Sequence, residues 1–359
     1  MPGRDFGDSV RWALQARGMS IRAASRALSY DHAYLSRVLA GKQLPSPELL
    51  ASLDQLLGTD WSARRDPAAA PENDFSRSAV THLLEHDNRH GGNHVASAAV
   101  QVWRAEQKKL NGENKRHLSA VAELAEISGW LLFDANRQDE ARAALVESQM
   151  LAKIAGDGPL EWFALDLLAM HSVHNGSAGE ALSISDEILT RPGIPNRVAL
   201  MSQVRRARAL AQAGDRARAL DAMERATGAM QDSAPDREPA WTWWIDDAEI
   251  TGHYGELWLS LGDGKAALPH LERAAEVEHG GGRRKLGHLV ALLTGFVSVQ
   301  AWRESEKALL EIFDLLDIVT SARSRERLKE TLRGIRRDAP QWLADLADET
   351  AKAQLRTGD

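Results

Sequence analysis

The chain has 359 residues, enough for two or more domains, and it contains no cysteine. Structural disulfides and thiolate metal sites are therefore excluded, and this composition is typical of a reducing cytoplasm. The net charge of -7 argues against a protein that coats nucleic acid, yet residues 1–58 carry seven Lys or Arg and five Asp or Glu, while the remainder carries 37 and 46. No apolar run approaches the ~20 residues that a membrane span requires, so we expect a cytoplasmic protein without a membrane partner.

Residues 20–42 have the pattern of two short helices joined by a turn. Ser20 and Asp31 are each expected to cap a helix, because their side-chain oxygens can accept an unpaired backbone N–H at the helix start. The predicted helices span residues 21–28 and 32–40, and Gly41 is suited to end the second one. Residues at helical spacing are predicted to form a small core, namely Ile21, Ala24, Leu28, Leu35, Val38 and Leu39.

The sequence on either side of this pair predicts further helices and then a break. Val10 and Leu14 fit a helix that packs across the pair, and Pro47 is a good first residue for a helix with a leucine stripe. Residues 62–73 are rich in Ala and Pro without periodicity, which indicates a linker. We therefore expect a first domain over residues 1–60, a linker over 61–74 and a second domain over 75–359.

Over roughly residues 5–58 the chain resembles the Cro/repressor-type (Xre-like) helix-turn-helix family, through the cap at Ser20, the run Leu35-Ser36-Arg37-Val38 and the pair Gly41-Lys42. The resemblance implies a lambda-repressor-like domain that binds double-stranded DNA, with the second helix in the major groove. The expected contacts are phosphates at Ser20, Arg22 and Lys42, and base edges along the free face of the second helix at His32, Ala33, Ser36 and Arg37. Because the basic excess is small, two heads on a pseudo-palindromic operator are expected, which requires a homodimer.

From residue 75 onward the sequence shows paired amphipathic helices and no alternating strand pattern. Small residues recur twelve positions apart, at Gly129 and Ala141, Ala169 and Ala181, Ala207 and Ala219, and Gly255 and Ala267. A turn residue lies five positions before the second member of each pair, at Asn136, Gly176, Gly214 and Gly262, and a weaker fifth unit has Gln300 there. Small side chains suit the closest approach of two helices, and Gly or Asn suits the end of a helix.

These units resemble tetratricopeptide repeats, helical pairs of ~34 residues that stack into a superhelix. A preceding hairpin over residues 75–110 and closing helices over 321–335 and 341–355 are predicted to cap opposite ends of the array. With the motifs DNRHGGNH and LAKIAGD, the whole chain resembles a class of actinobacterial transcriptional regulators. The resemblance implies an all-α protein in which a tetratricopeptide-like domain senses an effector and dimerises.

In such superhelices the first helix of each pair lines the inner groove. Positions counted back from each turn, together with a tryptophan cluster, give the candidate ligand-binding residues Glu126, Trp130, Asp166, Met170, Arg208, Trp244 and Glu249. They predict an acidic, partly aromatic groove for a peptide or a cationic small molecule. The alternative is that the tryptophans are core residues between stacked helices.

The sequence offers little for catalysis. His82 to His86 match the H-x-x-E-H zinc motif formally, but a solvated helix face beside a glycine turn is the more typical origin of this pattern, so we expect no metal and no cofactor. No catalytic triad, carboxylate pair or nucleotide fingerprint is present, so we expect no enzyme. The favoured hypothesis is a sequence-specific transcriptional regulator. The alternative is an adaptor whose repeats bind a partner protein or signalling peptide, with DNA binding secondary.

Overall fold

The computed structural model describes residues 7, 10, 11, 13, 14, 17, 19–28, 30–40, 43, 45–57, 73–110, 114–232, 238–276 and 281–356. Within these ranges every regular element is a helix, so the predicted all-α class is confirmed. The chain forms two compact units, Met1–Asp74 and Phe75–Asp359. The expectations for Gly41, Lys42 and the linker up to Glu72 lie outside the described residues.

The first unit contains a capped helix-turn-helix. Its described helices are α2 (Ile21–Ala27), α3 (His32–Leu39) and α4 (Pro47–Leu57). The side chain of Ser20 accepts a hydrogen bond from the Ala23 backbone N at 3.2 Å, and that of Asp31 accepts one from Tyr34 N at 2.9 Å. Both predicted caps are therefore confirmed, and each helix ends one residue earlier than predicted.

The core of this unit joins the three helices to the segment before them. Four of the six residues predicted for the core are buried, while Ile21 and Leu28 are partly buried at its edge. The other buried members come from the flanking sequence: Val10, Leu14, Leu49, Leu53 and Leu57. This core fixes α3 by its apolar side and leaves the polar side free.

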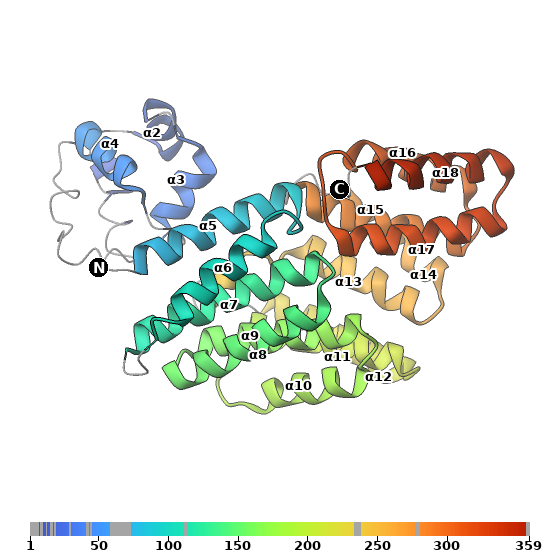
Figure 1. Cartoon of the computed structure of the whole chain (residues 1–359), viewed down its shortest axis with the longest axis horizontal. Coiled ribbons are helices and arrows are strands. Elements are labelled where there is room, and N and C mark those ends of the chain that lie inside the picture. Colours follow the sequence, from blue (N-terminus) through green and yellow to red (C-terminus); the bar gives the residue numbers. More distant parts are fainter. Residues whose placement is uncertain are drawn as a thin grey trace. The chain divides into compact units, whose positions relative to one another are not determined.

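The second unit is a series of helical hairpins (Figure 1). A first pair is formed by α5 (Asn73–His90) and α6 (Ala96–Gln107). The following pairs are α7 (Lys115–Asp134) with α8 (Gln138–Ala155), α9 (Gly158–His174) with α10 (Ala178–Thr190), α11 (Asn196–Gln212) with α12 (Arg216–Gln231), α13 (Asp247–Ser260) with α14 (Gly264–Ala275), α15 (Gly281–Ser298) with α16 (Trp302–Leu315), and α17 (Ala322–Asp338) with α18 (Gln341–Arg356). A short 3-10 helix, η2 (Ala240–Trp244), precedes α13.

Each predicted turn residue adopts the left-handed conformation. The φ angles are 58° at Asn136, 72° at Gly176, 78° at Gly214, 75° at Gly262 and 59° at Gln300. The next residue then donates its N–H to the carbonyl five positions back, as in the bond from Arg137 to Leu132 at 2.9 Å, and this pattern recurs at all five turns. Such a bond closes the end of the first helix and reverses the chain. The fifth unit, which the sequence showed only weakly, therefore has the same turn as the others.

Two of the helix crossings admit no side chain on the first helix. A Cβ atom built on Gly129 would lie 2.7 Å from Leu145, and one on Gly255 would lie 2.5 Å from Leu271. Both leucines lie sixteen positions after their glycine. In the hairpins where alanine replaces glycine, that later position holds Ser185 or Met223. The bulky branched leucine therefore occupies space that the glycine leaves open.

The first helices of the hairpins contact one another in a closed ring. Contacts run from α7 to α9, α11, α13, α15 and α17, and α17 returns to α7. At this closure Ser321 Oγ donates to buried Asp134 at 2.7 Å, and Thr320 N donates to His90 O at 2.7 Å. The two ends of the array were expected to lie apart as separate caps. Instead they meet, because a buried carboxylate near the first turn accepts hydrogen bonds from the start of α17.

None of the described helices has the length and apolarity needed to cross a membrane.

Candidate nucleic-acid interface and inner ring surface

The residues predicted to read DNA lie on α3. His32 and Arg37 are exposed, Ser36 is partly buried, and Ala33 lies one residue after His32 in the first turn. The Asp31 cap and the buried residues Leu35 and Val38 hold α3 from the opposite side. The arrangement presents polar groups near the start of a helix, as a recognition helix does.

The side chain of Arg37 is positioned by Gln43, a residue that the sequence analysis did not identify. The Nε of Arg37 donates to Oε1 of Gln43 at 3.0 Å, and both side chains lie at the surface. Gln43 comes from the segment after α3, which is itself tied back because Ser46 N donates to Tyr34 Oη at 3.1 Å. No periodicity marks Gln43, since it lies outside both helices. Its amide orients a guanidinium that has no ion-pair partner among the described residues.

The predicted phosphate contacts lie at the start of α2. Arg22 is exposed in the first turn of α2, and Ser20 is exposed while its hydroxyl caps the helix. Backbone N–H groups at a helix start favour anions, so Ser20 and Arg22 share a position suited to a phosphate. Lys42 lies outside the described residues.

The predicted ligand-binding residues fall on or beside the inner helices, but their acidic groups are paired. Asp166 is 1% exposed and accepts two hydrogen bonds from Arg205, at 3.1 and 3.0 Å. Glu249 lies 3.4 Å from His253 Nε2 and 3.3 Å from Arg284 Nε. Burial opposes its ionisation, but the hydrogen bond from His253 and the nearby cations lower the pKa of Glu249. These carboxylates are therefore held by neighbouring helices.

The remaining predicted residues divide between packing and polar contacts. Trp130 is partly buried and donates from Nε1 to Asp87 at 2.8 Å, while Met170 and Trp244 pack at the edges of apolar clusters. Glu126 is 6% exposed, and burial followed by the charge of Glu123 raises its pKa well above the ordinary value.

A cluster of arginines gathers where α11, α13 and α17 meet, and of its members the sequence analysis singled out Arg208 but neither Arg323 nor Arg327. Arg208 Nη2 lies 3.0 Å from Glu256, and Arg327 hydrogen-bonds the other oxygen of the same carboxylate. Burial opposes ionisation of Glu256, but Arg327 and Arg208 outweigh it and lower the pKa to about 2. Beside them, Arg323 lies with its guanidinium 5.0 Å from the Phe133 ring centre. Arg208 and Glu256 lie on the neighbouring helices α11 and α13, whereas Arg327 lies 71 positions after Glu256 and reaches it because α17 returns to the ring.

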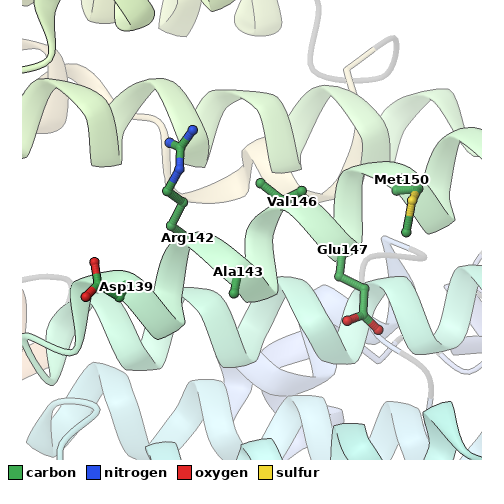
Figure 2. A pocket seen from close by; sticks show the side chains of 6 residues that line it. All are labelled: Asp139, Arg142, Ala143, Val146, Glu147 and Met150. Carbon is green, nitrogen blue, oxygen red and sulfur yellow. The ribbon is translucent and has the colours of Figure 1, made fainter.

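The outer side of α8 carries a different surface. Val146, Met150 and Ile154 are 45%, 51% and 57% exposed, and they lie four residues apart on one face. Figure 2 shows the shallow, open hollow on this face, lined by Asp139, Arg142, Ala143, Val146, Glu147 and Met150. We call the line from Asp139 through Val146 to Ile154 the α8 stripe. Its exposed apolar side chains are a feature of interaction surfaces.

The histidine-rich end of α5 does not assemble a metal site in the described part of the chain. No group of three or more His, Cys, Asp or Glu side chains there could hold a metal ion. His82 and Glu85 are exposed, while the rings of His86 and His90 lie 5.1 Å apart.

Comparison with known families agrees with the geometry of the first unit. The sequence model of a helix-turn-helix domain matches residues 5–67. The curated proteins compared with the chain include no match. The amino-terminal unit therefore carries a helix-turn-helix head of the kind that binds DNA.

Proposed function

We propose that the protein is a sequence-specific transcriptional regulator that acts in the cytoplasm and binds operator DNA as a homodimer. The observation that carries this proposal is the exposed polar face of α3, with Arg37 oriented by Gln43 on a capped helix-turn-helix. In this proposal His32, Ala33, Ser36 and Arg37 contact base edges, while Ser20, Arg22 and Lys42 contact phosphates. The hairpin ring is a tetratricopeptide-like domain that binds a peptide or small-molecule effector.

The test is selection from a random duplex library by the full-length protein at two salt concentrations. Enrichment of an inverted repeat with half-sites about 34–36 Å apart, or a multiple of that spacing, is expected for a dimeric helix-turn-helix protein. Because phosphate contacts release counterions, affinity is expected to fall steeply as salt rises. Weak binding without sequence preference would instead favour the adaptor, in which the repeats bind a partner protein or peptide.

We propose the α8 stripe as the surface that meets a second copy of the chain. Its ends carry opposite charges, Asp139 at one and Lys153 at the other, seven residues on either side of Val146. Two antiparallel copies centred on Val146 would place each Asp139 opposite a Lys153 and bury the exposed apolar side chains. A two-fold interface requires this self-complementarity.

Substituting Val146 with glutamate tests the dimer without touching the head. In the proposed arrangement Val146 lies opposite Val146 of the second copy, so two negative charges would meet and be desolvated there, and sedimentation equilibrium is expected to show a shift toward monomer while DNA binding weakens. Leu310→Glu on α16, where Leu310 is 50% exposed against 45% for Val146, is the matched control and should leave the assembly unchanged. A dimer that persists in Val146→Glu would place the interface elsewhere.

A further inference from the structure

We infer that the inner surface of the ring binds an oxyanion of the effector, a carboxylate or a phosphate group, through Arg208, Arg323 and Arg327. This inference rests on the proposed role of the ring as the effector-binding domain. It assigns a ligand chemistry opposite to the cationic ligand that the acidic residues of the sequence suggested. Three observations support it: the charge balance of the arginines, their unused hydrogen-bond donors and their exposure to solvent.

The charges of the arginines and carboxylates around Glu256 do not balance. One carboxylate, Glu256 on α13, lies between two guanidiniums, Arg208 on α11 and Arg327 on α17. Arg323, one turn before Arg327, has its own partner in Asp134 at 3.4 Å. Among the described residues the cluster therefore has one positive charge more than it has paired carboxylates. Asp166 does not reduce it, because Arg205 already pairs with Asp166.

Arg208, Arg323 and Arg327 also have hydrogen-bond donors that are not used by the described residues. A guanidinium carries five N–H donors, and in the described structure Arg208 and Arg327 each use one nitrogen on Glu256. The Nε atoms of Arg208 and Arg323 are buried and have no acceptor among the described residues. A buried donor without a partner is costly, and a guanidinium presents its donors in a fork that matches the oxygens of a carboxylate or phosphate.

Solvent reaches this surface. The side chains of Arg208, Arg323 and Arg327 keep 17%, 26% and 34% of their area exposed, although they lie on inner helices. The ring of Phe133, beneath Arg323, meets that of His174 from α9 edge to face at 5.0 Å. Burial and then the charge of Arg323 lower the pKa of His174 to about 4, so this imidazole is neutral near pH 7. The site thus joins a positive end to aromatic faces that can contact the body of a ligand.

Glu256 occupies the site as an internal competitor, and this gives the sharpest test. Removing its charge in Glu256→Gln frees both guanidiniums, so anion binding is expected to become about tenfold tighter or more. Arg208→Gln and Arg327→Gln are expected to weaken binding by about tenfold or more, because each removes charge-assisted hydrogen bonds. Loss of folding cannot mimic the tightening, which separates an anion site from a purely structural ion pair.

The experiment is a thermal-shift titration of the full-length protein with inorganic phosphate and, separately, with succinate, at an ionic strength held constant with potassium chloride. The unsubstituted protein should show a saturable rise in Tm with at least one anion, and the tighter anion distinguishes a phosphate from a carboxylate ligand. Arg303→Gln on α16, where the Arg303 side chain is 75% exposed, is the matched control and should titrate unchanged.

Absence of a saturable shift with both anions, or unchanged or weaker binding in Glu256→Gln, would overturn the inference. The titration contains no DNA. Failure here would therefore leave the proposed DNA binding standing, and failure of the library selection would leave an anion site intact.

Discussion

The recognition helix and the inner ring both depend on arginine, but they use it in opposite ways. Arg37 on α3 is exposed and, among the described residues, bonds the neutral amide of Gln43, so in the proposed function its charge can act on DNA. Arg205 in the ring is 4% exposed and is bound at two points by Asp166. An exposed charge contributes to binding with little effect on stability, whereas a buried pair strongly affects stability once either partner is lost.

The largest expected effect comes from breaking the buried pair. Asp166→Ala leaves the Arg205 guanidinium buried without a counter-charge, so the free energy of unfolding is expected to fall by about 3 to 5 kcal/mol. Urea denaturation at pH 7 measures this change. Asp186→Ala is the matched control, since its ion pair with Arg206 is partly exposed at 2.9 Å, and it is expected to cost at most about 1 kcal/mol. Equal losses of unfolding free energy in Asp166→Ala and Asp186→Ala would contradict the proposed difference between a buried and an exposed arginine pair.

Closure of the ring is expected to depend on Asp134. This carboxylate is fully buried and accepts hydrogen bonds from Ser321 Oγ at 2.7 Å and Gly92 N at 3.0 Å. Asp134→Asn removes its charge at similar size, and about 1.5 to 3 kcal/mol of stability should be lost. Hydrogen exchange should become faster at the start of α17. Exchange that rises equally in α10, away from the closure, would show a general loss of stability instead.

The sequence predicted the local features of the helix-turn-helix unit and of the ring, such as helix caps and turns. It did not predict which side chains of distant helices pair with one another. Ser20, Asp31 and the five turn residues act through atoms within a few positions along the chain, so the sequence pattern indicates them directly. The pairing of Arg327 with Glu256 spans 71 residues and requires α17 to return to the ring. The acidic residues predicted to line a groove lie on the first helices of their hairpins, α7, α9 and α13, but no periodicity reveals which arginine lies opposite each of them.

On the DNA side, the sharpest change is Arg37→Ala. If Arg37 contacts a guanine, affinity for the selected operator is expected to fall by about 1 to 3 kcal/mol, and the base preference at that position should relax. Because Arg37 is exposed, the free energy of unfolding should change by no more than about 0.5 kcal/mol. Fluorescence anisotropy with matched and single-base-changed duplexes measures both affinities. Arg303→Ala in the second unit is the control, and an unchanged base preference in Arg37→Ala would exclude the assigned contact.

The smallest expected effect is a pH dependence from the inner surface. Burial is the largest cause that lowers the pKa of His174 from 6.5 to about 4, and the charges of Arg323, His171, Arg327 and Arg208 lower it further. Between these values the unfolded chain binds the proton more readily, so the stability from this group falls as the pH drops from about 7 to 4 and then levels off.

His174→Gln removes this contribution, so the free energy of unfolding should fall less between pH 7.5 and 5 than in the unsubstituted protein. The difference is expected to be less than about 1 kcal/mol, because His174 keeps part of its surface in solvent, which screens the nearby charges. His253 and His171, whose pKa values are also lowered by burial, remain in the variant and retain part of the slope. Urea denaturation at several pH values measures the slopes, and the two proteins should agree closely at pH 7.5. Identical slopes would mean that the arginine cluster does not act on His174, and the positive potential inferred for the inner surface would lose this support.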